Sequence, residues 1–160
     1  MADLQSIFNN KRNFINLLLS DEELVKSLVN NEKNFLSIPV PDTSTVVFNH
    51  IFPCKYIPEV AEESKTFISM EFSYRQSKNT TYFRANTVTF YIFCAVNLIQ
   101  TDYEMLRYDF ILHHIDKMMR DSRSAEWIGK MEFDECKDLI LDQRGKYVGV
   151  AAAYRSVEFA

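Results

Sequence analysis

The segments ISMEFSYR (residues 68–75) and TVTFYIFCAV (residues 87–96) decide the fold, because apolar residues occupy every second position in each of them. In the first segment, serine, glutamate and arginine fill the positions between. This alternation is typical of a β-strand with one buried and one solvated face. A polar stretch at residues 76–79 separates the two segments, so they are predicted to form a long antiparallel hairpin.

The second strand differs from the first because its other face carries the large rings of Tyr91 and Phe93. Exposed rings on a sheet face forgo burial, which is worth about 25 cal/mol per Å² of apolar surface. We therefore expect Tyr91 and Phe93 to lie at a subunit interface. The end of the hairpin is basic, and its residues Arg75, Lys78 and Arg84 are expected to form a docking loop for a partner.

Helical patterns precede and follow the hairpin. The beginning of the chain is dense in leucine, isoleucine and phenylalanine and predicts two helices. The second of them is expected to start near Asp21, after a capping box formed by Ser20 and Glu23. A third helix, with a wide apolar face, is predicted over residues 102–119 with Thr101 as its N-cap.

The remaining segments complete the predicted architecture. Residues 31–64 hold all four prolines and show no long period, and a short strand is expected at 45–48. Two more strands are predicted near residues 128–136 and 147–159. The fold class is therefore predicted to be α+β, with a mixed, mostly antiparallel sheet. Two hairpins split by the long helix form this sheet, and the N-terminal helices pack on one face.

The composition excludes several classes of protein. The 160 residues are 47% hydrophobic and 25% charged, so residues 1–160 are predicted to form a single domain. No apolar run approaches the roughly 20 residues of a membrane span, and the net charge of −4 is opposite in sign to a nucleic-acid-binding face. The three cysteines lack the spacing of a metal site and predict free thiols in a reducing compartment.

The residues with potential for chemistry do not form a recognisable active site. His113 and His114 are adjacent on the predicted helix, so their side chains point about 100° apart and do not readily share one metal ion. Three glycines in the whole chain leave no glycine-rich phosphate loop. We therefore predict no catalytic residue, no metal site and no cofactor, and we expect that the protein is not an enzyme.

Carboxylates gather between Glu126 and Asp142, where six acidic residues stand against two lysines. Within this segment an acidic face is predicted on one strand, formed by Glu132, Asp134, Glu135 and Asp138. Alternation with apolar residues indicates a solvated face that acts through charge rather than proton transfer. With a basic hairpin end and an acidic segment, the monomer is expected to be electrostatically two-ended, which favours docking.

Several stretches together resemble a known group of phage proteins. They are Thr89–Cys94, Thr101–Tyr103, Leu106–Asp109, Ile128–Met131 and Tyr154–Phe159. In their apolar pattern and order, the chain resembles the tail-terminator and head–tail joining (neck) proteins of long-tailed bacteriophages. The resemblance implies a ring, commonly a homohexamer, that caps the tail tube, stops its polymerisation and joins the tail to the head connector.

The same resemblance implies the partners and the location. The protein is expected to bind further copies of itself, the tail tube protein and a head-completion or connector protein. It is expected to meet DNA only in passage through the lumen, and to need no cofactor or membrane. It is expected in the virion, at the neck, after assembly in the host cytoplasm. Without the resemblance, the residues also fit a small cytoplasmic adaptor or effector-binding module with an acidic docking face, and an enzyme is the third alternative.

Overall fold

The computed structural model describes residues 5–55, 64–76, 83–121, 131–141 and 146–156. These residues form three α-helices, two short 3-10 helices and five strands. In chain order these are α1 (Gln5–Leu19), α2 (Glu22–Val29), η1 (Phe35–Ser37), β1 (Ile51–Phe52), β2 (Thr66–Gln76), β3 (Phe83–Ala95), η2 (Val96–Leu98), α3 (Arg107–Arg120), β4 (Met131–Ile140) and β5 (Tyr147–Ser156).

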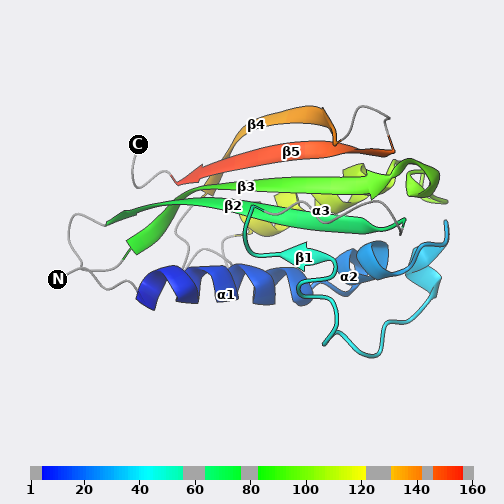
Figure 1. Cartoon of the computed structure of the whole chain (residues 1–160), viewed down its shortest axis with the longest axis horizontal. Helices are drawn as coiled ribbons and strands as arrows, with labels where there is room; N and C mark the ends of the chain where they lie inside the picture. Colours follow the sequence, from blue (N-terminus) through cyan, green and yellow to red (C-terminus); the bar gives the residue numbers. More distant parts are fainter. Residues whose placement is uncertain (1–4, 56–63, 77–82, 122–130, 142–145, 157–160) are drawn as a thin grey trace.

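The five strands form one open, mixed sheet in the order β1-β2-β3-β5-β4 (Figure 1). The short strand β1 runs parallel to β2, and the other three pairs are antiparallel. β2 with β3, and β4 with β5, are the two predicted hairpins, and α3 lies between them in the chain. The α+β fold class predicted from the sequence is confirmed.

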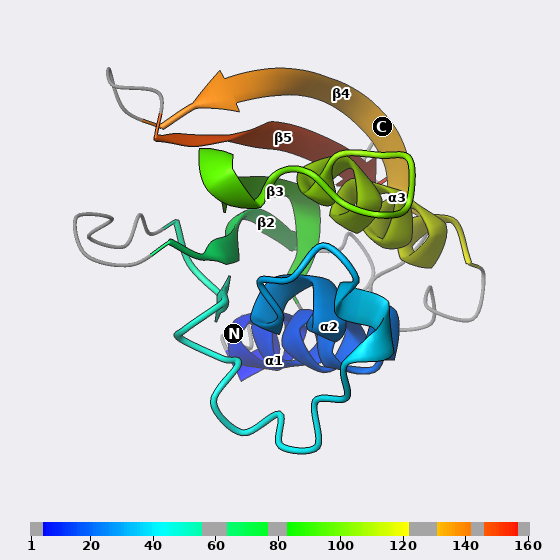
Figure 2. The same cartoon turned by 90° about the vertical axis from the view of Figure 1, so that its right-hand side faces the viewer.

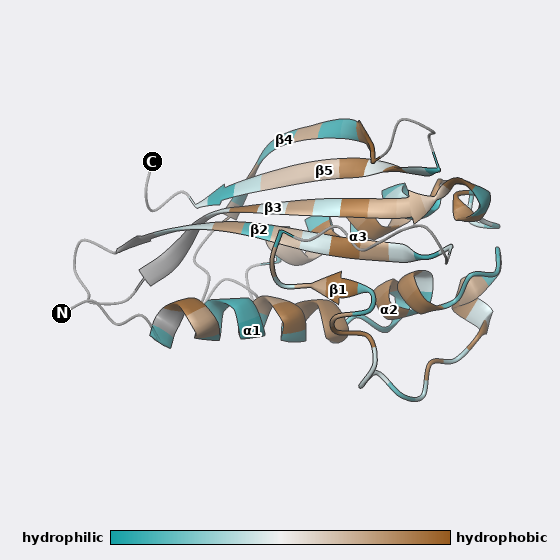
Figure 3. Ribbon diagram, viewed as in Figure 1, coloured by the Kyte–Doolittle hydropathy of each residue, from teal (hydrophilic) through white to brown (hydrophobic). Residues whose placement is uncertain are grey.

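All three helices contribute to a core on one face of the sheet, which Figure 2 shows from the end of the molecule. Phe14 of α1, Leu24 of α2 and Ile111 of α3 are fully buried against Phe90 and Val150 of the sheet. Along β2 and β3 hydrophobic residues alternate with more polar ones (Figure 3), as the period-2 pattern predicts. We call the opposite side of the sheet, which faces away from the helices, the outer face.

The third helix begins later than predicted. It starts at Arg107, and residues 101–106 form a turn. The Thr101 hydroxyl, expected to cap the helix, instead donates to the Met105 carbonyl at 2.6 Å and accepts from the Tyr103 N–H at 3.3 Å. Such local hydrogen bonds compete with helix formation. Glu104, with a φ of 62°, interrupts the helical backbone at the same place.

Two further details of the prediction are wrong. The cap of α2 is Asp21 rather than Ser20, because the Asp21 carboxylate accepts from the Leu24 N–H at 3.1 Å. The strand expected at residues 45–48 is a turn, and the strand of this region, β1, follows it. Among the described residues, no helix has the length and hydropathy that crossing a bilayer requires.

Candidate functional site

The outer face carries its own apolar cluster, so part of it is covered within the monomer. Phe93 is only 5% exposed and packs against Phe67, with the two ring centroids 5.4 Å apart. Phe67 in turn contacts Phe52 and Tyr147. The expectation that the Phe93 ring is exposed is therefore wrong, because neighbouring strands and β1 already cover it. The assignment of Tyr91 and Phe93 to a subunit interface stays a prediction.

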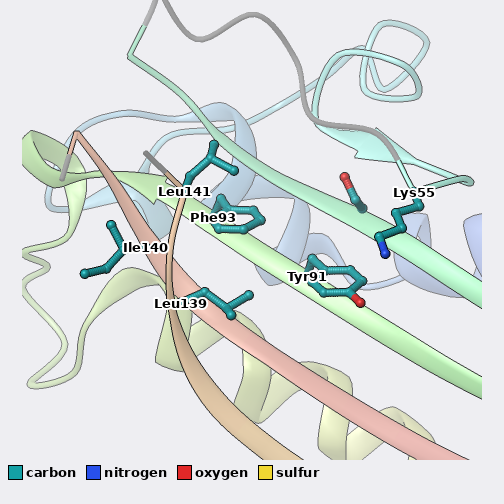
Figure 4. A pocket seen from close by; sticks show the side chains of 7 residues that line it. Lys55, Tyr91, Phe93, Leu139, Ile140 and Leu141 are labelled. Atoms are coloured by element: carbon teal, nitrogen blue, oxygen red, sulfur yellow. The ribbon is translucent and has the colours of Figure 1, made fainter. Parts of the chain in front are cut away.

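Beside this cluster, the outer face has a pocket of about 240 Å³, which we call the outer pocket. Its lining joins Tyr91 and Phe93 with the end of β4 and with the segment after β1, and comprises Lys55, Ser69, Tyr91, Phe93, Leu139, Ile140 and Leu141. Leu139 and Leu141 lie on the side of the two rings, whereas Ile140 points away from them (Figure 4). The register explains this difference, since Leu139 stands opposite Gly149 and Ile140 opposite Val148.

A polar network borders the outer pocket. The Tyr91 hydroxyl donates to Glu71 at 2.9 Å, and the Lys55 ammonium lies 3.2 Å from the same carboxylate and 5.9 Å from the Tyr91 ring centroid. The hydrogen bond from Tyr91, helped by Lys55, lowers the pKa of Glu71 despite the opposing effect of burial. The outer pocket is thus an apolar hollow with one fixed polar border, an arrangement suited to binding rather than to proton transfer.

The predicted acidic face lies on β4, and all four of its carboxylate residues are exposed. However, the register of β4 against β5 shifts between Phe133 and Glu135, so Asp134 lies in a bulge. Glu135 therefore stands opposite Ala153 on the outer face, whereas Asp138 stands opposite Val150 on the helix side.

The electrostatics agree with this placement of Asp138. Burial, and then the charge of Asp138, raise the pKa of Asp109 on α3. Glu132, opposite Arg155, is on the outer face with Glu135. The four acidic residues share one strand but not one face, and the prediction of a single acidic face is corrected accordingly.

The basic hairpin end is only partly within the described structure. The backbone of Arg75 stands opposite that of Arg84 where β2 and β3 pair. Lys78 lies outside the described residues. The docking role of Arg75, Lys78 and Arg84 therefore stays a prediction.

The two histidines have different surroundings. His114 Nδ1 is 2.8 Å from Asp21 and its Nε2 is 3.4 Å from Glu23, so His114 joins α3 to the start of α2. Burial acts to raise the pKa of Asp21, but the hydrogen bonds from His114 and from the Leu24 N–H outweigh it and lower the pKa. His113 is exposed. In the described part of the chain, no group of three or more potential metal ligands comes together.

Sequence reasoning missed Arg107, which is fully buried at the start of α3. Its guanidinium donates five hydrogen bonds of 2.8 to 3.2 Å, all to backbone carbonyls, and its Cζ lies 4.7 Å from the Phe35 ring centroid. Four of the five carbonyls belong to the end of α2 and the residues after it, from Ser27 to Glu32. Burial lowers the pKa of the guanidinium from its ordinary value. Arg107 thus satisfies carbonyls that a helix end leaves without partners.

Phe48 is the second residue that the sequence did not single out. It is 69% exposed and has a φ of 64°, in the left-handed region that large side chains rarely adopt. It lies in the turn before β1, a segment for which a strand had been predicted. Only its place in the long segment 31–64 pointed toward it, because a connection of that length in a small domain usually either carries function or packs against another subunit.

Comparison with known proteins places this chain in a phage-derived family. A family model described as YomW matches residues 21–156, a range that includes α2, α3 and all five strands. The family consists of SPbeta-like phage gene products. Neither the curated proteins nor the solved structures gave a match. The chain therefore belongs to the YomW family and is a phage-associated protein.

Proposed function

We propose that this protein is a structural component of the virion, a tail terminator that forms a ring, caps the tail tube and joins the tail to the head connector. Membership of a phage-derived family over residues 21–156 supports a role in the phage. The α+β architecture, with two hairpins split by a helix, agrees with the resemblance of the sequence to tail-terminator and neck proteins.

The observation that carries the proposal is the outer pocket. Leu139, Leu141 and Phe93 line a hollow open to solvent, whereas the rest of the apolar cluster beside it is closed. An apolar hollow of this kind gains free energy when a side chain of another molecule fills it. The predicted interface residues Tyr91 and Phe93 both lie in its wall.

A terminator also needs two different faces. A tube of stacked rings ends in a surface that still binds the next ring, so growth continues until another protein covers that surface. The covering protein must bind the tube on one side and the head connector on the other. In this proposal the exposed carboxylates of β4 and the basic residues of the hairpin end supply the difference in charge between the two sides.

The proposal includes the partners, the location and the absence of catalysis. The partners are further copies in a homohexameric ring, the tail tube protein and the head-completion or connector protein, and the site is the neck of the virion. DNA passes through the lumen without being held. The carboxylates of β4 act through charge, because exposed groups in water lack the desolvation that tunes a catalytic acid or base.

Deletion of the gene from the phage tests the proposal. We expect electron micrographs of the lysate to show tails of uncontrolled length that are not joined to filled heads, and expression of the intact protein in trans to restore normal particles. Normal-length tails attached to heads in the deletion lysate would refute the assignment.

The exposed acidic residues of β4 also favour a second candidate, a cytoplasmic adaptor with an acidic docking surface. This candidate predicts that the protein is absent from purified virions. Mass spectrometry of gradient-purified particles separates the two, because a terminator stays in the particle in a fixed number of copies.

A further inference from the structure

The turn at residues 46–51, which we call the Phe48 turn, presents an aromatic ring to solvent. The Phe48 side chain is 69% exposed, although Val46 and Ile51 on either side of it are fully buried. An exposed phenylalanine on its own needs no explanation, since much of any protein surface is apolar. What distinguishes Phe48 is the backbone conformation that holds it there.

Phe48 has a φ of 64°, a conformation that glycine adopts freely and asparagine tolerates. A phenylalanine at such a position is strained, and strain of this kind is often found at functional sites. Most of the surface of the Phe48 ring faces solvent, so within the described part of the chain its burial does little to offset the strain. A phenylalanine at position 48 therefore destabilises the turn.

Hydrogen bonds hold the Phe48 turn in one shape. The Val46 carbonyl accepts from the backbone N–H groups of Asn49, His50 and Ile51, at 3.2, 2.8 and 3.1 Å. The Phe48 N–H donates to the Ile51 carbonyl at 2.9 Å. A ring on such a turn loses little freedom when it binds, which is the property of an interface anchor.

The turn is also attached to the sheet. His50 accepts the Ile68 N–H at its carbonyl, at 2.7 Å, and its Nδ1 lies 2.7 Å from the Thr66 carbonyl. The Lys65 ammonium donates to the Asn49 carbonyl at 3.0 Å. The ring of Phe48 is therefore fixed relative to β2, and through β2 relative to the rest of the sheet.

The outer pocket offers a receptor of matching size and chemistry on the same chain. Its volume of about 240 Å³ exceeds the roughly 150 Å³ of an apolar cavity that holds benzene. Leu139, Leu141 and Phe93 supply apolar walls, and Tyr91 supplies an aromatic one (Figure 4). The pocket and the Phe48 turn share no residue, so each can be engaged at the same time.

We propose that Phe48 of one copy inserts into the outer pocket of a second copy of this chain. In a closed ring of subunits the contact is heterologous, because Phe48 of each copy enters the pocket of the next. An open row of copies leaves one Phe48 side chain free at one end and one pocket free at the other until the assembly closes. The inference rests on the proposed function, for which it names the contact that joins neighbouring subunits of the ring.

Photo-crosslinking tests the contact directly. The full chain carrying p-benzoylphenylalanine in place of Phe48 is mixed with an isotopically labelled, otherwise unaltered copy and irradiated. We expect crosslinks between the two copies that map to Leu139–Leu141 or to Tyr91–Phe93. Crosslinks confined to one copy, crosslinks to other surfaces, or none at all would overturn the inference.

Two matched pairs of variants separate binding from folding. Phe48→Gly removes the aromatic ring and also relieves the positive φ, so we expect the thermal stability to be kept or raised. We expect the dissociation constant for self-association, measured by sedimentation velocity, to rise by about 30-fold or more. Glu104→Gly relieves the positive φ of a second described residue, in the turn before α3, and should leave association unchanged. Leu139→Glu, in the wall of the pocket, should abolish association, whereas Phe8→Glu, at an exposed residue of α1 that does not line the pocket, should not.

The outcomes distinguish this inference from the proposed function. If Phe48→Gly associates as the unaltered chain does, or restores normal tails to a deletion phage, the inference is wrong and the terminator assignment stands. If the deletion phage makes normal tails although the crosslink reaches the pocket, the assignment is wrong and the contact between copies stands.

Discussion

Replacing Arg107 by methionine should remove a large part of the stability of the fold. Methionine fills a similar volume but donates no hydrogen bond, so five carbonyl groups lose their partner. The contacts to Asn31 and Glu32 are only partly buried, and water can replace the guanidinium there. Those of Leu98, Ser27 and Asn30 are buried, and water does not reach them easily.

The expected loss follows from these three carbonyls. A buried acceptor left without a donor costs about 1–3 kcal/mol, so three of them at the lower part of that range cost roughly 3–5 kcal/mol. The free energy of unfolding of a small domain is only about 5–15 kcal/mol. Arg107→Lys should fall between the two proteins, because one ammonium group cannot reproduce the five directed donors of a guanidinium.

Urea denaturation followed by circular dichroism measures the effect, with Arg120→Met as the control. Arg120 is on the same helix and pairs with Asp116 at 2.8 Å, but its side chain is 73% exposed. We expect the control to change the free energy of unfolding by less than about 1 kcal/mol. A loss of less than about 1 kcal/mol in Arg107→Met would refute the view that Arg107 holds the end of α2 against α3.

Three further predictions concern acid stability, backbone packing and surface charge. Asp21→Asn keeps a side chain that caps α2 but removes the charge beside His114. Because folding lowers the pKa of Asp21, its carboxylate stabilises the fold above pH ~4, and this stabilisation is lost as the pH falls through the folded pKa. Urea titrations of the two proteins should therefore differ at pH 7 and converge in acid. Gly149→Ala should destabilise the sheet by about 1–3 kcal/mol in the same assay. The added Cβ would lie 2.8 Å from the Ile92 carbonyl carbon and 3.0 Å from Phe93 Cα, and both are backbone atoms. An unchanged midpoint of urea denaturation would contradict this packing. Replacing Asp134, Glu135 and Asp138 together by Asn or Gln should change the salt dependence of tail joining gradually, and an activity abolished by any one of these substitutions would show proton transfer instead.

The parts of the fold that the sequence predicted are those in which local pattern and burial agree. Alternation over residues 68–75 and 87–96 predicts a strand independently of its tertiary contacts, because the side-chain period of a strand is two. The start of α3 could not be predicted from a local pattern. Thr101 has the residue type of an N-cap, but its hydroxyl is used by the Met105 carbonyl in a tight turn.

The features of the candidate site that were missed depend on contacts between distant residues. Arg107 binds carbonyls about 75 residues earlier in the chain, and no local pattern records that. The bulge at Asp134 puts Glu135 on the same face as Glu132 and Asp138 on the opposite face, whereas strict alternation along the strand predicts the reverse. Tyr91 and Phe93 were identified as residues of the outer face, but whether neighbouring strands cover them is decided by the sheet as a whole.

The sheet also determines how a contact between Phe48 and the outer pocket would propagate. The Phe48 turn is hydrogen-bonded to β2, and the pocket is built on β3 and the end of β4, so one continuous sheet separates the two surfaces. The sheet holds the two surfaces in one relative orientation, and this orientation is the same in every copy because every copy has the same fold. A constant rotation is the condition for a heterologous contact to close into a ring of defined size rather than to give mixed assemblies. Ring size would then be a property of the backbone, and substitutions in the pocket that preserve its apolar lining should change the affinity between copies without changing their number.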